Sequence, residues 1–130
     1  MEKEINLGKP LQEEAIKHIL TDLLKADGWD VQTAWGHKRG VDIDARRGNE
    51  RWLIEVKGPG ASSQARVNYF LGILGETLRR MDDSGARYSI AFPDMKQYRN
   101  LWYSLPKLAK KRTCIDMILV DSIGNIEELK

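Results

Sequence analysis

The stretch of residues 40–58 constrains the fold of this chain more than any other part of the sequence. It contains two runs, residues 41–46 and 51–57, in which apolar and polar side chains alternate. A period of two is typical of half-buried β-strands. Gly48 and Asn49 lie between the runs and are a common hairpin pair. The sequence therefore predicts an antiparallel β-hairpin.

Acidic side chains and a lysine gather on one face of this predicted hairpin. Asp42 and Asp44 lie on the polar face of the first run, and Glu55 and Lys57 lie on the polar face of the second. Antiparallel pairing brings such side chains close together. We expect either an ion-paired surface or a site that binds a cation and catalyses a reaction.

Length and composition limit the class of protein. The chain has 130 residues, one cysteine and a net charge of +2. This length fits a single domain over residues 1–130 with its own hydrophobic core. One cysteine excludes an internal disulfide and fits a reducing compartment. The sequence begins without an apolar leader and has no run of membrane-spanning length, so we expect a cytoplasmic protein with no membrane partner.

The remaining elements follow from periodicity and from turn residues. An apolar stripe predicts a first helix over residues 10–28, and Ser62 caps a predicted second helix. The expected buried stripe of that second helix is Val67, Phe70, Leu71, Leu74, Leu78 and Met81. Further strands are predicted at residues 29–35, 87–92, 115–121 and 126–129, with a third helix that Pro106 interrupts. This order predicts an α/β fold with an αβββαβ core, in which helices flank a central mixed β-sheet.

The acidic face has the chemistry that phosphodiester hydrolysis requires. Mg²⁺ can activate a water nucleophile and neutralise charge on phosphate oxygens, and it prefers hard oxygen ligands. Asp42 and Glu55, together with the carbonyl of Val56, are the candidate ligands. Lys57 is a candidate catalytic residue that orients the water or stabilises the transition state, and without a metal it would neutralise the carboxylates. Asp44 is either a second ligand or a surface partner for Arg46.

Basic residues cluster locally although the whole chain is nearly neutral. Such clusters either contact phosphates or form an ordinary solvated surface. Lys38 and Arg39 lie in a glycine-flanked turn, and Arg66 lies one turn into the helix that follows the candidate site. These three residues are the candidate nucleic-acid contacts. Basic residues also concentrate at 79–80 and 107–112.

Asp42 followed by Glu55-Val56-Lys57 resembles the D…(D/E)xK signature of the restriction-endonuclease-like, or PD-(D/E)xK, nuclease superfamily. The predicted order of elements is similar to the core of that superfamily, and the acidic residues fall on its second and third strands. Val41 stands where the family often has proline. The resemblance implies a metal-dependent DNA endonuclease that uses Mg²⁺ or Mn²⁺ and usually acts as a homodimer.

The same resemblance implies roles for two further residues. Many members place a glutamate on the first helix, directed at the metal. Glu14 is the candidate here, although His18 occupies the position expected from the end of the helix. Related nucleases also carry a glutamine near the start of the second helix, where Gln64 stands, to orient the water. For Glu14 and Gln64 the alternative is an ordinary polar residue near a helix terminus.

A second, narrower resemblance runs along most of the chain. Residues 26–29, 54–57, 90–93 and 115–121 are similar to the XisH-type fdxN-element excision controlling factors, small cyanobacterial proteins of the same superfamily. This implies a role in DNA rearrangement beside a recombinase or another accessory protein. Three functions stay open: a DNA endonuclease in rearrangement, repair or restriction; a non-catalytic DNA-binding accessory factor on the same fold; and an interaction protein whose acidic face meets a basic partner.

Overall fold

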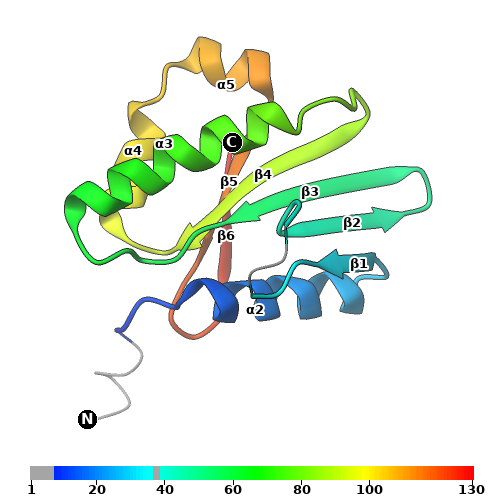
Figure 1. The fold of residues 1–130 in the computed structure, drawn as a ribbon, viewed down its shortest axis with the longest axis horizontal. Coiled ribbons are helices and arrows are strands. Elements are labelled where there is room, and N and C mark those ends of the chain that lie inside the picture. Colours follow the sequence, from blue (N-terminus) through cyan, green and yellow to red (C-terminus); the bar gives the residue numbers. More distant parts are fainter. Residues whose placement is uncertain (1–7, 37–38) are drawn as a thin grey trace.

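The computed structural model describes residues 8–36 and 39–130, and within them a six-stranded sheet lies between helices (Figure 1). The strand order is β1-β2-β3-β4-β5-β6. The helices are α2 (Glu13–Ala26), α3 (Ser63–Arg79), α4 (Lys96–Ser104) and α5 (Lys107–Thr113). The strands are β1 (Asp30–Thr33), β2 (Ile43–Arg47), β3 (Glu50–Val56), β4 (Ala86–Pro93), β5 (Asp116–Val120) and β6 (Ile126–Leu129).

The sheet mixes antiparallel and parallel pairs. The first three strands form an antiparallel meander, β3, β4 and β5 pair in parallel, and β6 returns antiparallel to β5. The parallel pairs need crossovers, which α3 supplies between β3 and β4 and which α4 and α5 supply between β4 and β5. The predicted α/β fold, with its αβββαβ order and central mixed sheet, is confirmed.

The predicted hairpin is present as β2 and β3. Arg47 pairs with Glu50 across a two-residue turn, and Ile43 pairs with Ile54. Gly48 has a φ of 59°, the left-handed backbone that this tight turn requires and that glycine adopts at low cost. The register buries Ile43 and Ile54 completely and sets the positions of the acidic residues at the other end of the hairpin.

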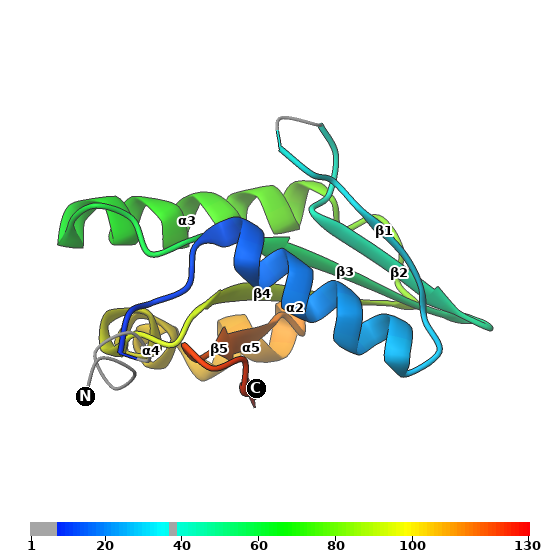
Figure 2. The ribbon, with the colours of Figure 1, turned by 90° about the horizontal axis from the view of Figure 1, so that it is seen from below.

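The two faces of the sheet carry two hydrophobic clusters. One side is covered by α2, whose Ile16, Leu20 and Leu24 pack with buried residues of β2 and β3. The other side is covered by α3 and α4, whose buried residues include Phe70, Ile73, Tyr98 and Trp102. Figure 1 shows α2 below the sheet and α3, α4 and α5 above it, and Figure 2 shows the same layers from below.

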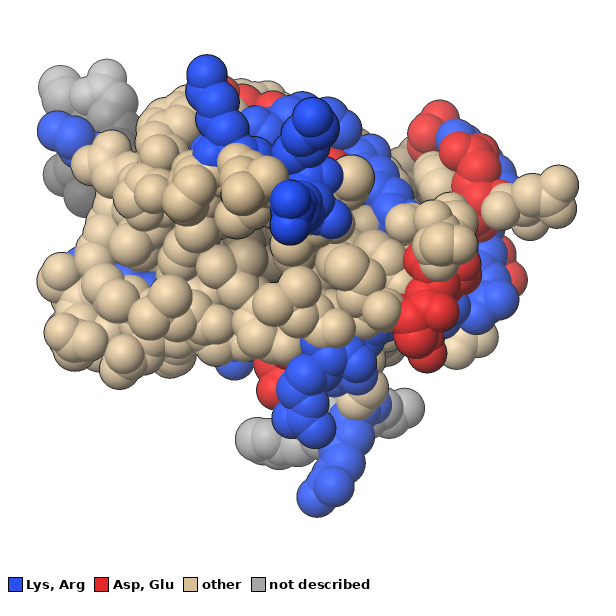
Figure 3. All heavy atoms as spheres, turned by 90° about the horizontal axis from the view of Figure 1, so that it is seen from above, with Lys and Arg blue, Asp and Glu red and all other residues tan. Residues whose placement is uncertain are grey.

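The predicted buried stripe of α3 is partly wrong. Phe70 is buried as expected, but the helix turns Ile73 and Thr77 to the sheet, while Leu71 and Leu78 are 59% and 51% exposed. Thr77 tolerates burial because its hydroxyl donates to the Ile73 carbonyl at 2.7 Å. Both sides of the helix, the one with Ile73 and the one with Leu71 and Leu78, carry apolar residues. Periodicity alone therefore does not decide which side faces the sheet. Figure 3 shows the resulting uncharged surface over the N-terminal part of α3.

The break predicted at Pro106 is confirmed, because α4 ends at Ser104 and α5 begins at Lys107. Pro106 has a φ of −62° and occupies the N-cap of α5, where its missing N–H group costs no helical hydrogen bond. Among the helices of residues 8–36 and 39–130, none is long and apolar enough to cross a lipid bilayer.

The side of α3 that faces the sheet predicts how substitutions in this helix change the free energy of unfolding. Ile73→Ala should lower the free energy of unfolding by about 2–5 kcal/mol, because it empties a fully packed position. Leu71→Ala, two residues away on the exposed side, should change it by less than about 0.5 kcal/mol. Urea unfolding followed by circular dichroism measures both. Equal losses for the two variants would contradict the structure and favour the stripe expected from the sequence.

Candidate functional site

Asp42 and Glu55 meet where β2 begins and β3 approaches its end. The Asp42 N–H donates to Glu55 Oε1 at 3.3 Å, and Asp42 Oδ2 accepts from the Val56 N–H at 2.8 Å. The two side chains are therefore held against each other by the hairpin backbone. The Glu55 side chain is 9% exposed and that of Asp42 is 21% exposed. The structure thus brings together the two carboxylates that the sequence singled out.

A buried lysine of α2, Lys17, lies on the Asp42 side of this pair. Its ammonium is 3.3 Å from Asp42 Oδ1 and 3.3 Å from Glu13 Oε2, and it donates to the Ala34 carbonyl at 2.8 Å. The Lys17 side chain is 2% exposed. Burial acts to lower the pKa of Lys17, but the Asp42 and Glu13 carboxylates outweigh it and raise that pKa above its ordinary value. Lys17 is therefore a fixed positive charge inside the site.

A second cation, Arg80, comes from the C-terminal end of α3. Its Nε donates to Glu55 Oε2. Burial nevertheless raises the pKa of Glu55 to about 7, because the hydrogen bond from Arg80 lowers it only in part and the nearby Asp42 charge raises it further. Glu55 is thus a carboxyl group that titrates near neutral pH.

Lys57 follows β3 and points elsewhere. Its ammonium lies 5.3 Å from the centre of the Tyr69 ring on α3, and its N–H donates to the Ala91 carbonyl at 3.0 Å. Within the described residues the neutralising role predicted for Lys57 is carried instead by Lys17 and Arg80. The reason is geometric: both helices reach the carboxylates from the flanks, while Lys57 lies beyond the end of the strand.

The link after Lys57 runs closely past the start of α2. A Cβ atom on Gly58 would come within 3.0 Å of the backbone nitrogen of Glu13, so a larger residue there would push the helix away. Tyr98 fixes the same link by donating its hydroxyl to the Gly58 carbonyl at 2.7 Å. This contact keeps the N-terminal turn of α2, and with it Lys17, beside the hairpin.

Three other acidic or aromatic candidates have partners of their own. Glu14 accepts a hydrogen bond from the Gly36 N–H at 3.1 Å and lies 3.9 Å from the Lys17 ammonium. His18 stacks on Trp35 with ring centres 4.3 Å apart. Asp44 accepts two hydrogen bonds from Arg51, at 3.1 and 3.3 Å, and is 3.7 Å from Arg46. The ion pair expected between Asp44 and Arg46 is present, and the contacts of Asp44 with Arg51 are shorter.

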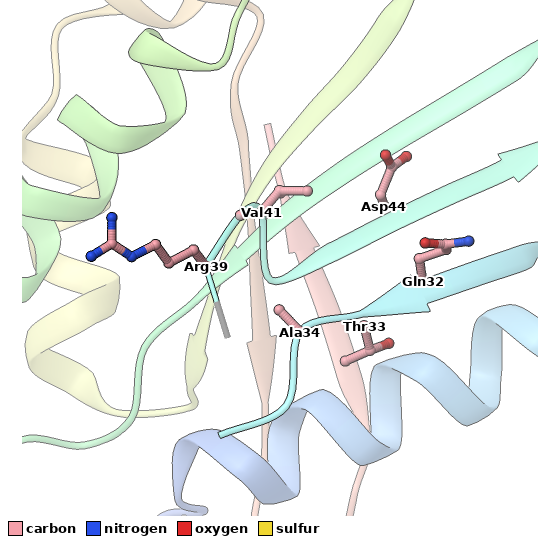
Figure 4. A pocket seen from close by; sticks show the side chains of 7 residues that line it. Gln32, Thr33, Ala34, Arg39, Val41 and Asp44 are labelled. Atoms are coloured by element: carbon pink, nitrogen blue, oxygen red, sulfur yellow. The ribbon is translucent and has the colours of Figure 1, made fainter. Parts of the chain in front are cut away.

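The candidate nucleic-acid contacts are spread over the surface. Lys38 lies outside the described residues. Arg39 lines a shallow pocket formed by the β1 and β2 ends, and its side chain points away from Asp44 and Gln32 (Figure 4). Arg66 donates to Gln97 at 2.6 Å and to the Pro59 carbonyl at 3.1 Å, so it joins α3, α4 and the preceding loop.

Gln64, the residue expected to orient water, lies in the first turn of α3. Its amide donates to Asn68 at 3.3 Å on an exposed surface. Ser62 caps this helix as predicted by accepting from the Ala65 N–H at 3.1 Å. Gln64 is therefore placed by the helix start rather than by a contact with Asp42 or Glu55.

The donor set at Asp42 and Glu55 fits a magnesium or manganese ion in type and number. Mg²⁺ keeps several waters and commonly uses one or two protein carboxylates. Among the described residues, no group of three or more His, Cys, Asp or Glu side chains is placed to hold a metal. Each carboxylate oxygen of the pair already accepts from one protein donor and retains a further lone pair. A cation would therefore share these oxygens with Lys17 and Arg80.

Sequence reasoning missed Lys17 and Arg80 as parts of the site. Lys17 does carry a signal, because it lies within the apolar stripe of α2 and four residues after Glu13. A lysine at a core-facing helical position requires a buried anion, which could have been sought among the strand carboxylates. Arg80 belongs to a basic pair noted in the sequence, but nothing local links it to Glu55.

Two solved structures share this fold. One is an XisH family protein from Nostoc punctiforme, at 20% identity and a TM-score of 0.57, with 88% of this chain and 98% of that chain covered. The other is an fdxN element excision controlling factor protein from Anabaena variabilis, at 20% identity and a TM-score of 0.59, with 89% and 99% covered. No protein-family model and no curated protein sequence matches the chain. At this identity the likeness shows the fold.

The raised pKa of Glu55 predicts a pH dependence of stability. A carboxyl group whose pKa is about 7 when folded, against an ordinary 4.5, binds its proton more tightly in the folded state. The free energy of unfolding should therefore fall as the pH rises between these two values. Urea unfolding at pH 5 and pH 8 should show this loss in the wild type and a smaller one in Glu55→Gln. A carbon-13 NMR titration of Glu55 with a midpoint near 4.5 would contradict it.

The buried ammonium of Lys17 predicts a coupled pair of substitutions. Lys17→Met should lower the free energy of unfolding by about 1–3 kcal/mol, because it leaves the Asp42 carboxylate without its cation. Adding Asp42→Asn should recover part of that loss, since the uncompensated charge is removed. Lys25→Met, on the exposed surface of the same helix, is the matched control and should have little effect. Strict additivity of the first two substitutions would show that Lys17 and Asp42 do not interact.

Proposed function

We propose that this protein is a metal-dependent DNA endonuclease of the PD-(D/E)xK type that hydrolyses phosphodiester bonds during DNA rearrangement. The observation that carries the proposal is the Asp42–Glu55 pair. Two carboxylates are held beside each other by backbone hydrogen bonds, one directly before β2 and one in β3, mostly shielded from water, with a lysine directly after β3. A surface ion pair alone would not need this burial, which costs free energy for each charge.

The residues of the site divide the work as follows. Asp42, Glu55 and the Val56 carbonyl would hold Mg²⁺ or Mn²⁺, which when bound activates water and neutralises charge on the phosphate. Lys57, with its ammonium over the Tyr69 ring, would donate to a phosphate oxygen and stabilise the charge that develops there. Lys17 would orient Asp42 through their ion pair. Glu14 and Gln64 remain proposed accessory residues at the edge of this site.

The proposed biological setting comes from the fold relatives. One of them is named as an fdxN element excision controlling factor protein, which fits a role in DNA excision. A homodimer would supply two sites for cutting two strands, and a recombinase is a suitable protein partner. Arg39 and Arg66, with Lys38, are proposed to contact the DNA.

A second function is favoured by one specific observation. Lys17 and Arg80 already place a positive charge on each carboxylate of the pair. A site that is neutralised internally can serve as a rigid structural element without any metal. The alternative is therefore a non-catalytic DNA-binding accessory factor on the same fold, in which Asp42 and Glu55 tie the sheet to its helices.

Metal binding and strand cleavage separate these two functions. Calorimetric titration of Mg²⁺ and Mn²⁺ should show binding to the wild type and its loss in Asp42→Asn and Glu55→Gln. Supercoiled plasmid should be nicked by the wild type in Mg²⁺, while Lys57→Met should bind metal normally but nick at least about 100-fold more slowly, as expected for a lost charge-stabilising group.

Asp44→Asn is the matched control for these variants. It removes a carboxylate two residues from Asp42 that is paired with Arg51, and it should leave metal binding and nicking unchanged. Equal metal binding by all variants, or nicking that survives Asp42→Asn, would overturn the endonuclease proposal. Binding of DNA without metal affinity would support the accessory factor.

A further inference from the structure

The short helix α5 carries a concentrated positive charge that the proposed catalytic site does not use. Its seven residues include Lys107, Lys110, Lys111 and Arg112, and every residue of the helix is at least partly exposed. Figure 3 shows basic side chains gathered on this side of the molecule, next to the uncharged surface of α3. The helix α5 thus adds positive charge to the surface but places no fully buried side chain in the core.

These four cations differ from most other basic residues of the chain in lacking acidic neighbours. The sequence between Asp94 and Asp116 contains no Asp or Glu. Most of the other described arginines are ion-paired: Arg51 pairs with Asp44, Arg80 with Glu55 and Arg87 with Asp116. Within the described residues, no ion pair involves a side chain of α5.

Helix stability does not account for this arrangement. Lys110, Lys111 and Arg112 lie in the last turn, where positive charge favours the helix dipole. Lys107, however, lies at the first turn, where the dipole disfavours it. Lys107 also faces Lys110 and Lys111 at spacings of three and four residues, which destabilises a helix by about 0.2–0.5 kcal/mol per pair. A partner with regularly spaced negative charge would remove this repulsion.

We infer that α5 is a docking surface for the phosphate backbone of duplex DNA. Seven helical residues extend about 10 Å, a length over which one DNA strand presents about three phosphates. The Lys110 ammonium also lies 4.8 Å from the centre of the buried Trp102 ring. Phosphate contacts carry no sequence information, so this surface would bind DNA of any sequence.

The position of α5 connects this surface with the proposed function, on which the inference rests for its nucleic-acid partner. The helix lies on the same side of the sheet as α3, whose Arg80 holds Glu55 (Figure 1). DNA held along α5 would thus lie on the Glu55 side of the sheet. An anionic membrane is a weaker match, because Leu108 is the one large apolar residue exposed on α5.

The test compares two double variants of the full chain. Lys107→Gln/Lys111→Gln removes two exposed charges of α5 and leaves the Lys110 contact with Trp102 intact. Lys9→Gln/Lys25→Gln removes two exposed charges elsewhere and is the matched control. Fluorescence anisotropy with a 20-base-pair duplex, in EDTA and at 50 to 200 mM salt, measures binding without cleavage.

Four phosphate contacts from α5, shared between the two DNA strands, contribute a fall of about 150-fold in affinity over this range of salt, and two contacts contribute about 12-fold. The α5 variant should show the smaller fall and weaker binding at 50 mM salt, while the control should match the wild type. The thermal midpoint of the α5 variant should stay the same or rise, because repulsion is relieved. Equal binding by the two double variants would overturn the inference, as would a wild type that does not bind the duplex.

Two further measurements separate this inference from the endonuclease proposal. Asp42→Asn should bind the duplex in EDTA as the wild type does, and the α5 variant should keep wild-type Mg²⁺ affinity in calorimetry. Absent metal binding with α5-dependent DNA binding would remove the endonuclease and leave the docking surface. Intact metal-dependent nicking with α5-independent DNA binding would keep the endonuclease and remove the docking surface.

Loss of binding to phosphatidylserine vesicles, but not to DNA, in the α5 variant would assign α5 to a membrane and overturn the inference.

Discussion

The antiparallel register between β2 and β3 is the constraint on which the rest of the molecule depends. It places Ile43 opposite Ile54 in the core between the sheet and α2, and the same register brings Asp42 beside Glu55. A slip by one residue would turn every side chain of a strand to the other face. The free energy of burying the apolar residues therefore also fixes the geometry of the carboxylates, so core packing and site geometry cannot vary independently.

The charge of that carboxylate pair is balanced by the two helical layers together. Lys17 approaches Asp42 from α2 on one side, and Arg80 approaches Glu55 from the end of α3 on the other. The site consequently lies where both layers and the sheet meet. This arrangement explains how two acidic groups can be so poorly exposed: each has a cation and a backbone N–H group as partners. It also defines what a metal ion would compete with, since Lys17 and Arg80 offer positive charge at fixed positions.

The two proposed functions, endonuclease and accessory factor, assign different roles to Lys17 and Arg80. In an endonuclease they orient the carboxylates and share them with Mg²⁺, and DNA held along α5 is presented to a working site. In an accessory factor they are the permanent partners of the carboxylates, and α5 alone meets the DNA. The fold relatives include a protein named as an fdxN element excision controlling factor.

The sequence by itself determined the class of fold, the hairpin, the Ser62 cap of α3 and the two carboxylates of the site. These features follow from local periodicity, from turn residues such as Gly48, and from residues that neighbouring strands bring together. Tertiary structure decided which side of α3 faces the sheet, and it decided that Lys17 and Arg80, not Lys57, neutralise the acids. Both decisions depend on how helices dock onto the sheet. Docking is fixed by the packing of residues distant in the chain, so a local signal such as the lysine in the apolar stripe of α2 indicates a buried anion but does not say which one.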